Sequence, residues 1–297
     1  MSAPAEPPAV FASAGARAVV LTTLTMLAFA GNSILCRLAL KETAIDPASF
    51  AALRLAAGVA ALVIIVSVAQ RGERMRAKGG WASALALFLY AAFFAFAYVD
   101  LDAASGALIL FGFVQATMIG AGLVAGDRPA PLEWGGWLAA AAGLSVLLLP
   151  GARAPSPAGA ALMAVAGVAW GLYSLRGKRE TRPVAATAGN FLRALAFVAP
   201  LLLVARHDLH ATAAGALLAA ISGAITSGVG YVLWYAALAH LTSMQAALVQ
   251  LSVPAVAAAG GVLLLAEPLS VRLVTAGALI LGGIWLALRS GASRRKA

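Results

Sequence analysis

The chain has 297 residues, of which 62% are hydrophobic and 11% are charged, and its mean hydropathy is +0.93. Soluble domains carry about 25% charged residues, so this composition excludes a soluble globular protein and indicates a chain built for the lipid bilayer. The net charge of +10 does not indicate a nucleic-acid partner, because the basic residues gather in alternate loops between apolar segments.

Ten apolar stretches are predicted to span the bilayer, since about 20 apolar residues cross a hydrocarbon core of ~30 Å. They lie near residues 17–39, 47–69, 79–99, 103–125, 131–150, 157–177, 185–205, 212–238, 243–265 and 269–289. Residues 1–16, rich in Pro and Ala, are predicted to form a disordered tail, and residues 291–297 a basic cytoplasmic tail. The predicted fold class is therefore an all-α integral membrane protein with ten transmembrane helices and no soluble domain.

The distribution of basic residues predicts the orientation in the membrane. With a cytoplasmic N-terminus, most Lys and Arg residues fall on the cytoplasmic side, and only Lys41, Arg153, Arg206 and Arg272 face the opposite side. This distribution satisfies the positive-inside rule and places both termini in the cytoplasm. The excess of Arg over Lys and the abundance of Ala and Gly favour a bacterial inner (plasma) membrane.

The two halves of the chain share a layout at an offset of about 140 positions, which is typical of a duplicated transporter. The segment from Phe94 to Arg128 matches the segment from Trp234 to Pro268, and Gly143 matches Gly283. We interpret residues 17–150 and 151–290 as two five-helix repeats. Because five is odd, the repeats must lie in opposite orientations in the membrane.

In the first predicted span, Asn32 and Ser33 fall near mid-membrane. A carboxamide in hydrocarbon costs several kcal/mol unless it is paired, so Asn32 must face protein or water. Two interpretations remain open, an interhelical hydrogen bond or a contact with the substrate. In the second span, Arg54 is costly unless it is paired or close to the interface. We interpret Arg54 and its second-half counterpart Arg193 as structural.

Aromatic residues form a stripe on the third span, where Tyr90, Phe94 and Tyr98 recur at intervals of four. The eighth span carries a similar group, and the sixth carries aromatic side chains on one face. We expect these groups either to line a cavity or to pack between helices. The second-half residues concerned are Tyr231, Trp234 and Tyr235 in the eighth span and Trp170 and Tyr173 in the sixth.

The fourth and ninth spans carry the remaining polar or helix-breaking residues, namely Gln115 in the fourth and Gln245, Gln250 and Pro254 in the ninth. A Pro inside a helix frees a carbonyl one turn earlier and bends the helix. Bent helices at equivalent places in the two halves of a transporter point to the binding site. The Gly-rich fifth and tenth spans are predicted to serve packing or a dimer face.

The sequence lacks the motifs of several chemistries. It contains no complete Walker A loop, HExxH or CxxC motif, and Cys36 is the one cysteine. We therefore expect neither a cofactor nor a metal site and no enzymatic activity. All acidic residues fall in the tail, in loops or near span ends. This placement favours a neutral or zwitterionic substrate over a cationic drug exchanged for a proton on a buried acid.

These features resemble the drug/metabolite transporter superfamily and, within it, the ten-span EamA-type branch. The resemblance is carried by Asn32-Ser33 and Trp170-Gly171, by Phe50-x-x-x-Arg54, by the Ala/Ser-rich entries to the fourth and ninth spans, by Pro254 and by Ala266-Glu267-Pro268. Two positions depart from the pattern, since Ala30 stands where the family often has Trp and Gln115 lies where the fourth span usually has Pro. Gly230-Tyr231-x-x-Trp234 is similar to YddG-type exporters of aromatic and other amino acids.

The resemblance implies a basket in which the first, third, fourth, sixth, eighth and ninth spans line the cavity. It also implies export by alternating access. We predict a transporter of aromatic or hydrophobic amino acids or similar small metabolites, present in the bilayer as a monomer or homodimer. The predicted substrate-binding residues are Asn32, Ser33, Tyr90, Tyr98, Gln115, Trp170, Tyr173, Tyr231, Trp234, Gln245 and Gln250, and Pro254 is the predicted gating residue.

Two alternatives stay open. One is the same fold with another cargo, such as cationic drugs, purines or nucleotide sugars. The other is a membrane-embedded enzyme acting on lipid headgroups, for which the candidate cluster is Arg206, His207, Asp208 and His210.

Overall fold

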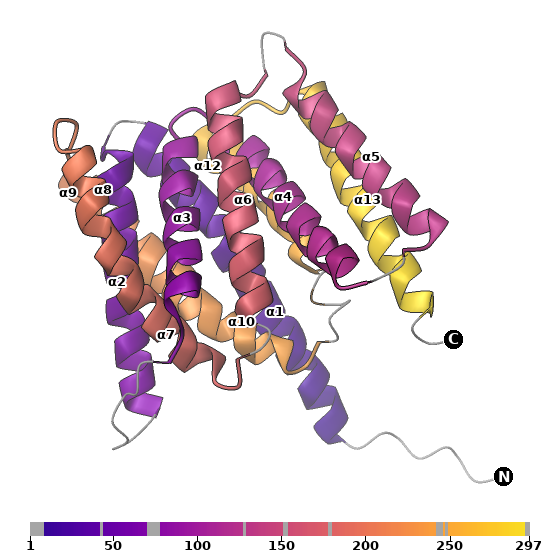
Figure 1. Ribbon diagram of the computed structural model, residues 1–297, viewed down its shortest axis with the longest axis horizontal. Coiled ribbons are helices and arrows are strands. Elements are labelled where there is room, and N and C mark those ends of the chain that lie inside the picture. Colours follow the sequence, from indigo (N-terminus) through magenta and orange to yellow (C-terminus); the bar gives the residue numbers. More distant parts are fainter. Residues whose placement is uncertain are drawn as a thin grey trace.

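The computed structural model describes residues 9–41, 44–69, 78–126, 129–150, 154–177, 180–241, 246 and 249–294, and every regular element among them is helical (Figure 1). The first half contains α1 (Ala9–Lys41), α2 (Pro47–Ala69), α3 (Trp81–Ala97), α4 (Ala103–Val124) and α5 (Pro131–Leu148). The second half contains α6 (Pro157–Gly177), α7 (Pro183–Ala194), η1 (Leu195–Phe197), α8 (Val198–Val204), α9 (Ala213–Ile221), η2 (Ser222–Val229), α10 (Gly230–Leu238), α12 (Ser252–Leu265) and α13 (Val271–Arg294).

Six helical segments are long and apolar enough to cross a membrane, and they are Ala16–Lys41, Pro47–Val68, Ala103–Val124, Pro157–Gly177, Pro183–Val204 and Ala213–Leu238. Trp81–Ala97, Ser252–Leu265 and Val271–Ala287 are shorter apolar helices. The chain is therefore an all-helical, multi-pass membrane protein, as its composition predicts. The total of ten spans and their grouping into inverted repeats stay predictions.

Local sequence signals explain several helix boundaries. α2, α5, α6 and α7 each begin with Pro, whose fixed φ and missing N–H suit the first helical turn. Asp46 caps α2 by accepting a hydrogen bond from the Ser49 N–H at 2.8 Å, and Thr212 caps α9 in the same way. α1 begins at Ala9, inside the predicted tail of residues 1–16, because Ala-rich sequence readily extends a helix. α13 likewise continues to Arg294, into the predicted tail of residues 291–297.

The predicted ninth span differs most from the structure. A helix was expected over residues 243–265, with Pro254 in its interior. The described residues 246 and 249–250 are helical, but a turn at Leu251 separates them from α12, which begins at Ser252. Pro254 therefore lies in the first turn of α12, where its missing N–H costs little. The helix is interrupted one turn before Pro254. In a continuous helix, a carbonyl at this place would accept a hydrogen bond from the backbone N–H of residue 254, which Pro lacks. The predicted site residue Gln245 lies outside the described residues.

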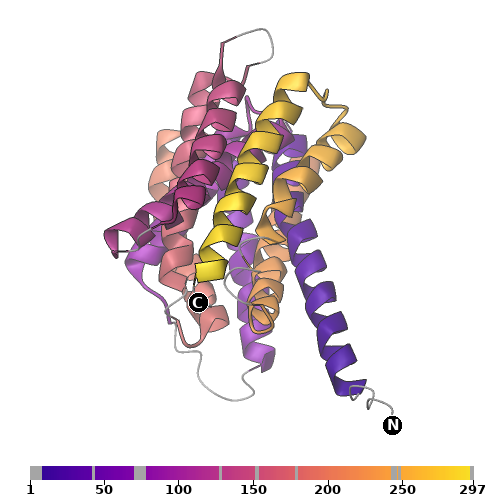
Figure 2. The ribbon, with the colours of Figure 1, turned by 90° about the vertical axis from the view of Figure 1, so that its right-hand side faces the viewer.

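The helices α5 and α13 form a pair at one side of the molecule, and Figure 2 shows this side. Their backbones meet at glycines. A Cβ atom at Gly136 would lie 2.5 Å from the Gly283 carbonyl oxygen, and one at Gly143 would lie 2.7 Å from the Cβ of Leu279. Small residues thus allow the close helix contact that the sequence predicts for these two helices.

The remaining helices form the main bundle. Within it α6 packs on α3 and α4, α1 packs on α10 and α12, and α2 packs on η2. The contact of α2 with η2 is close enough that a Cβ at Gly223 would collide with the backbone carbonyl of Arg54. The start of α1 and the end of α13 lie toward the lower end in Figure 1, and the connections from α1 to α2, α3 to α4 and α12 to α13 lie at the upper end.

Candidate functional site

A small cavity lies inside the main bundle and receives side chains from α1, α3, α4, α6 and α10. Its volume is about 20 Å³, enough for about one water molecule. The residues that line it are Phe29, Asn32, Ser33, Tyr90, Phe94, Leu110, Phe111, Trp170 and Tyr231. A cavity of this size cannot hold an amino acid, so the bundle is closed around its centre.

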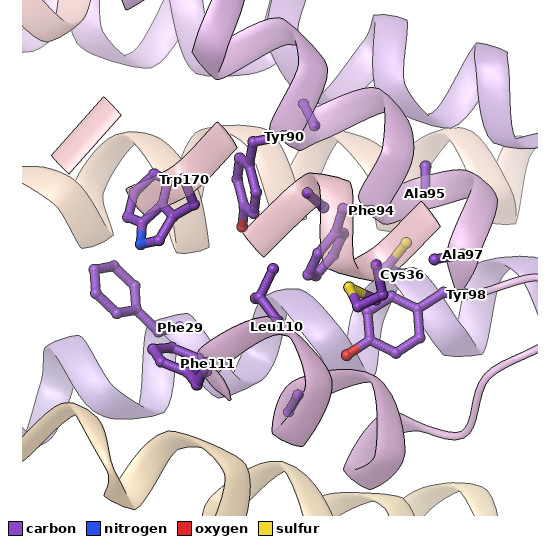
Figure 3. Packing of buried hydrophobic residues seen from close by; sticks show 14 of the residues in the cluster. Phe29, Cys36, Tyr90, Phe94, Ala95, Ala97, Tyr98, Leu110, Phe111 and Trp170 are labelled. Carbon is purple, nitrogen blue, oxygen red and sulfur yellow. The ribbon is translucent and has the colours of Figure 1, made fainter. Parts of the chain in front are cut away.

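Aromatic rings make most of the cavity wall, and Figure 3 shows Trp170 beside Tyr90 and Phe29. The centroid of its ring lies 4.8 Å from that of Tyr90, 5.2 Å from Tyr231 and 6.3 Å from Phe29. Tyr173 stacks on the same indole at 5.5 Å, from one turn further along α6. Such contacts contribute about 0.5–1.5 kcal/mol each beyond the area they bury. The cavity therefore has a wall suited to an apolar or aromatic group.

The polar part of the site is a hydrogen-bonded group that joins α1 to η2. The Oδ1 atom of Asn32 accepts hydrogen bonds from the hydroxyls of Ser222 at 2.9 Å, Thr226, and Ser227 at 3.3 Å. The Asn32 amide donates to the Thr226 carbonyl at 3.4 Å. Asn32 thus makes the interhelical hydrogen bonds that were one of its two interpretations, and it also borders the cavity. The π-helical turn η2 brings the three hydroxyls together.

Arg54 lies beside this group and is 2% exposed. Its Nε donates to the Ser227 hydroxyl at 3.2 Å and its Nη2 to the Tyr90 hydroxyl at 3.0 Å. The guanidinium carbon lies 5.1 Å from the ring centroid of Tyr90 and 4.9 Å from that of Phe94. Two of these three neighbours line the cavity.

The structure brings five of the predicted site residues together at the cavity, and they are Asn32, Ser33, Tyr90, Trp170 and Tyr231. Three more lie in a second layer. The Tyr173 hydroxyl hydrogen-bonds to Thr187 at 3.3 Å, Trp234 is half-buried with its ring centroid 5.9 Å from that of Phe29, and the Tyr98 hydroxyl donates to the Ala103 carbonyl at 3.3 Å.

The two predicted glutamines that the structure describes, Gln115 and Gln250, are not among the residues that line the cavity. Gln115 is buried at 5% exposure on α4 but does not line the cavity. The Gln250 amide donates to the Ala246 carbonyl at 3.2 Å, one turn earlier in its own segment. The assignment of Gln115 and Gln250 to the substrate site stays a prediction.

Sequence reasoning missed several neighbours of the cavity. Phe29, Leu110 and Phe111 carry no signal in a chain with so many apolar residues. The hydroxyls of Ser222, Thr226 and Ser227 do carry one, since three hydroxyl residues within six positions of an apolar span must find partners.

Arg37 and Glu267 form an ion pair at the upper end of the bundle, one turn beyond Ser33 on α1. Arg37 Nε donates to Glu267 Oε1 at 3.2 Å, and its Nη1 donates to the carbonyls of Tyr98 and Val99 at 3.0 and 2.8 Å. The other Glu267 oxygen accepts the Ala103 N–H at 2.9 Å. One carboxylate thus ties the end of α1 to the start of α4 and to the α12–α13 connection.

Burial raises the pKa of Glu267 above its ordinary value, although the Ala103 hydrogen bond and the Arg37 guanidinium lower it. Asp46 in the α1–α2 connection shows the opposite balance. Burial alone would raise its pKa, but hydrogen bonds from Ser49 and His210 hold it below the ordinary value. Hydrogen bonding thus favours the ionised form of Asp46, which suits its capping position, whereas burial favours the protonated form of Glu267.

A larger hollow of about 270 Å³ lies at the upper end between α4, α5 and α13. Its polar lining includes Asp100, Asp102 and Arg272. Asp100 accepts a hydrogen bond from Ser156, and Arg272 donates to the Leu149 carbonyl. Its lining comes from helix ends and connections, so we take the central cavity as the candidate site.

Comparison with known proteins gives three findings. The model of the EamA-like transporter family matches residues 157–289. The uncharacterized protein PA1977 of Pseudomonas aeruginosa is 54% identical over 272 residues, which cover 92% of this chain and 94% of that protein. A solved structure, described only as the crystal structure of a protein, superposes with a TM-score of 0.66 at 22% identity and covers 91% of this chain and 96% of the other. This last likeness concerns the fold alone.

Proposed function

The chain belongs to the EamA-like transporter family, whose members are membrane transporters of small solutes, and from this premise we propose that it exports aromatic or hydrophobic amino acids, or similar small zwitterionic metabolites. The observation that carries the proposal is the central cavity, where Trp170, Tyr90 and Phe29 surround the polar groups of Asn32 and Ser33. Aromatic faces suit an apolar side chain, and a few placed polar groups suit the charged backbone of an amino acid.

The proposed mechanism is alternating access, in which the closed cavity opens first to one side of the membrane and then to the other. Its volume of about 20 Å³ means that the helices must move to admit a substrate. The Arg37–Glu267 contact closes the upper end, which we assign to the side away from the cytoplasm. The turn at Leu251 and the π-helical η2 interrupt regular helix beside the bundle centre and supply places where the backbone can adjust.

The pairing of helices supports the proposed division into two inverted five-helix repeats. If each helix is replaced by its counterpart in the other half of the chain, the α3–α6 contact becomes the contact of η2 and α10 with α1. In the same way the α4–α6 contact becomes the α12–α1 contact. The α2–η2 contact corresponds in the same way to the α7–α3 contact, and the α5–α13 contact to itself. This exchange is what a two-fold axis in the membrane plane produces.

Counterflow in proteoliposomes tests the proposal. Purified protein is reconstituted into vesicles preloaded with unlabelled amino acids, and uptake of labelled phenylalanine is measured. We expect uptake that aromatic and aliphatic amino acids block and that purines, nucleotide sugars and cationic drugs do not. Absence of counterflow with every amino acid, from folded and monodisperse protein, would remove this cargo.

Substitutions in the same assay locate the site. Trp170→Ala and Trp234→Ala should each lower uptake at unchanged expression, because both rings lie at or against the aromatic wall. Trp134→Ala is the matched control, since Trp134 is 47% exposed on α5, outside the main bundle. Wild-type uptake by both variants would discard this site.

A further inference from the structure

Arg54 is a buried cation without a counter-ion. It lies about two turns into α2 and is 2% exposed. In the part of the chain that the structure describes, no carboxylate pairs with it, and Asp102 and Glu267 pair with Arg37 instead. A buried, unpaired charge costs several kcal/mol, and ionisable residues inside a membrane protein usually mark a pathway or a binding site.

The partners of Arg54 are polar but uncharged. Nε and Nη2 bind the hydroxyls of Ser227 and Tyr90, and the guanidinium lies over the rings of Tyr90 and Phe94. These contacts solvate the cation without neutralising it. The third nitrogen, Nη1, is buried and has no hydrogen-bond partner among the described residues.

A second buried polar atom nearby also lacks a partner. The hydroxyl of Tyr231 is buried without a hydrogen bond in the described structure, and Tyr231 lines the cavity together with Tyr90 and Phe94. Side chains on α2, α3 and α10 thus place an unsatisfied cationic donor and an unsatisfied hydroxyl beside the aromatic wall. A buried donor is normally satisfied, so this pair indicates a missing anionic acceptor.

We propose that Arg54 binds the carboxylate of the transported substrate, with the Tyr231 hydroxyl as a second donor and the rings around Trp170 holding the side chain. The planar guanidinium offers donors in the fork geometry that carboxylates accept. Ser227 and Tyr90 hold the guanidinium in place, which leaves Nη1 for the ligand. This inference rests on the proposed amino acid cargo and narrows it, because the site then requires a carboxylate.

The first test compares wild-type protein with substrate analogues that differ in one group. Unlabelled phenylalanine and 3-phenylpropionate, which both carry the carboxylate, should compete with labelled phenylalanine. Phenylalaninamide and phenethylamine, which lack it, should compete at least about 30-fold more weakly, since hydrogen bonds to a charged group are lost. Equal competition by phenylalaninamide would overturn the proposal.

Variants then test Arg54 itself. Arg54→Gln should remove the preference for the carboxylate over the amide, and Arg54→Lys should retain part of it. Arg272→Gln is the matched control, because Arg272 lies outside the central cavity and donates to the Leu149 carbonyl, so the preference should persist. An Arg54→Gln variant that folds and keeps the preference would overturn the proposal. If that variant does not fold, the analogue comparison on wild-type protein decides.

Ligand-induced thermal stabilisation in detergent separates this inference from the proposed cargo. We expect 3-phenylpropionate to raise the unfolding temperature of wild-type protein, and 3-phenylpropanamide and inorganic phosphate not to do so. Stabilisation by 3-phenylpropionate without counterflow of any amino acid would keep the carboxylate site and reject the amino acid cargo. Equal stabilisation by phosphate or by the amide would reject the carboxylate site.

Discussion

Replacing Glu267 tests how the upper end of the bundle is closed. Its carboxylate is 7% exposed and accepts hydrogen bonds from Arg37 and Ala103. Glu267→Ala removes both acceptors and leaves the largely buried Arg37 guanidinium with the half-exposed Asp102, 3.7 Å away, as its remaining acidic partner. Breaking a buried ion pair costs about 3–5 kcal/mol. Because Arg37 keeps two carbonyl partners, we expect the low end of this range, about 3 kcal/mol.

Glu267→Gln separates charge from hydrogen bonding at the same position. The carboxamide has one acceptor oxygen, so one of the two donors meets an NH₂ group instead. Burial raises the pKa of Glu267, which means that its surroundings favour the uncharged form and that losing the charge costs little by itself. We therefore expect the loss of one hydrogen bond, about 1–2 kcal/mol.

The chain contains one cysteine, which provides the assay. Cys36 precedes Arg37 on α1 and is 0% exposed, so alkylation by N-ethylmaleimide requires the upper end to open. A loss of about 3 kcal/mol predicts labelling about 100-fold faster for Glu267→Ala, and about tenfold faster for Glu267→Gln. Asp208→Asn, at an exposed position of the same end, should leave the rate unchanged. Unfolding temperatures measured in parallel distinguish opening from unfolding.

Two results would refute this reasoning. Equal labelling rates for the Gln and Ala variants would mean that the charge of Glu267 holds the upper end together. This would contradict the inference, drawn from its raised pKa, that losing the charge costs little. Labelling at the wild-type rate in both variants would mean that Glu267 does not hold the upper end closed.

Three further predictions concern stability in detergent. Asn32→Leu should lower the unfolding free energy by about 2 kcal/mol, because three hydroxyls lose their acceptor, whereas the exposed Ser145→Ala should have little effect. Gly136→Ala should cost about 1–3 kcal/mol through collision with α13, while Gly135→Ala, with open space around it, should be neutral or slightly stabilising. Because the pKa of Glu267 is raised above its ordinary 4.5, the folded protein binds this proton more tightly than the unfolded chain. As pH falls from 7 toward 5, the unfolding free energy of wild type should therefore rise relative to that of Glu267→Gln.

The sequence predicts the helical segments well where a local signal exists. Pro47 and Pro157 mark the first residues of α2 and α6, as the ranges 47–69 and 157–177 require. The sequence also singles out Tyr90, Trp170 and Tyr231, because aromatic residues stand out among small aliphatic ones, and the structure then brings them to one cavity.

The surroundings of Arg54 could not be predicted in the same way. They depend on η2, whose π-helical turn places Ser227 beside the guanidinium, and on Gly223, which lets the two backbones meet. Local periodicity cannot predict contacts between residues so far apart in the chain. The Gln250 contact could not be predicted either, since a polar residue in an apolar span can also hydrogen-bond to the backbone of its own segment.

The π-helical turn η2 also determines which face of α10 borders the cavity. In an α-helix each residue advances the chain by about 100° and 1.5 Å. A change of η2 to regular α-helix that absorbs one residue would therefore rotate α10 about its own axis by roughly that angle. Tyr231 would leave the cavity wall, and another face of α10 would replace it. Rotation of α10 about its own axis, without any tilt, would then change which side chains face the cavity.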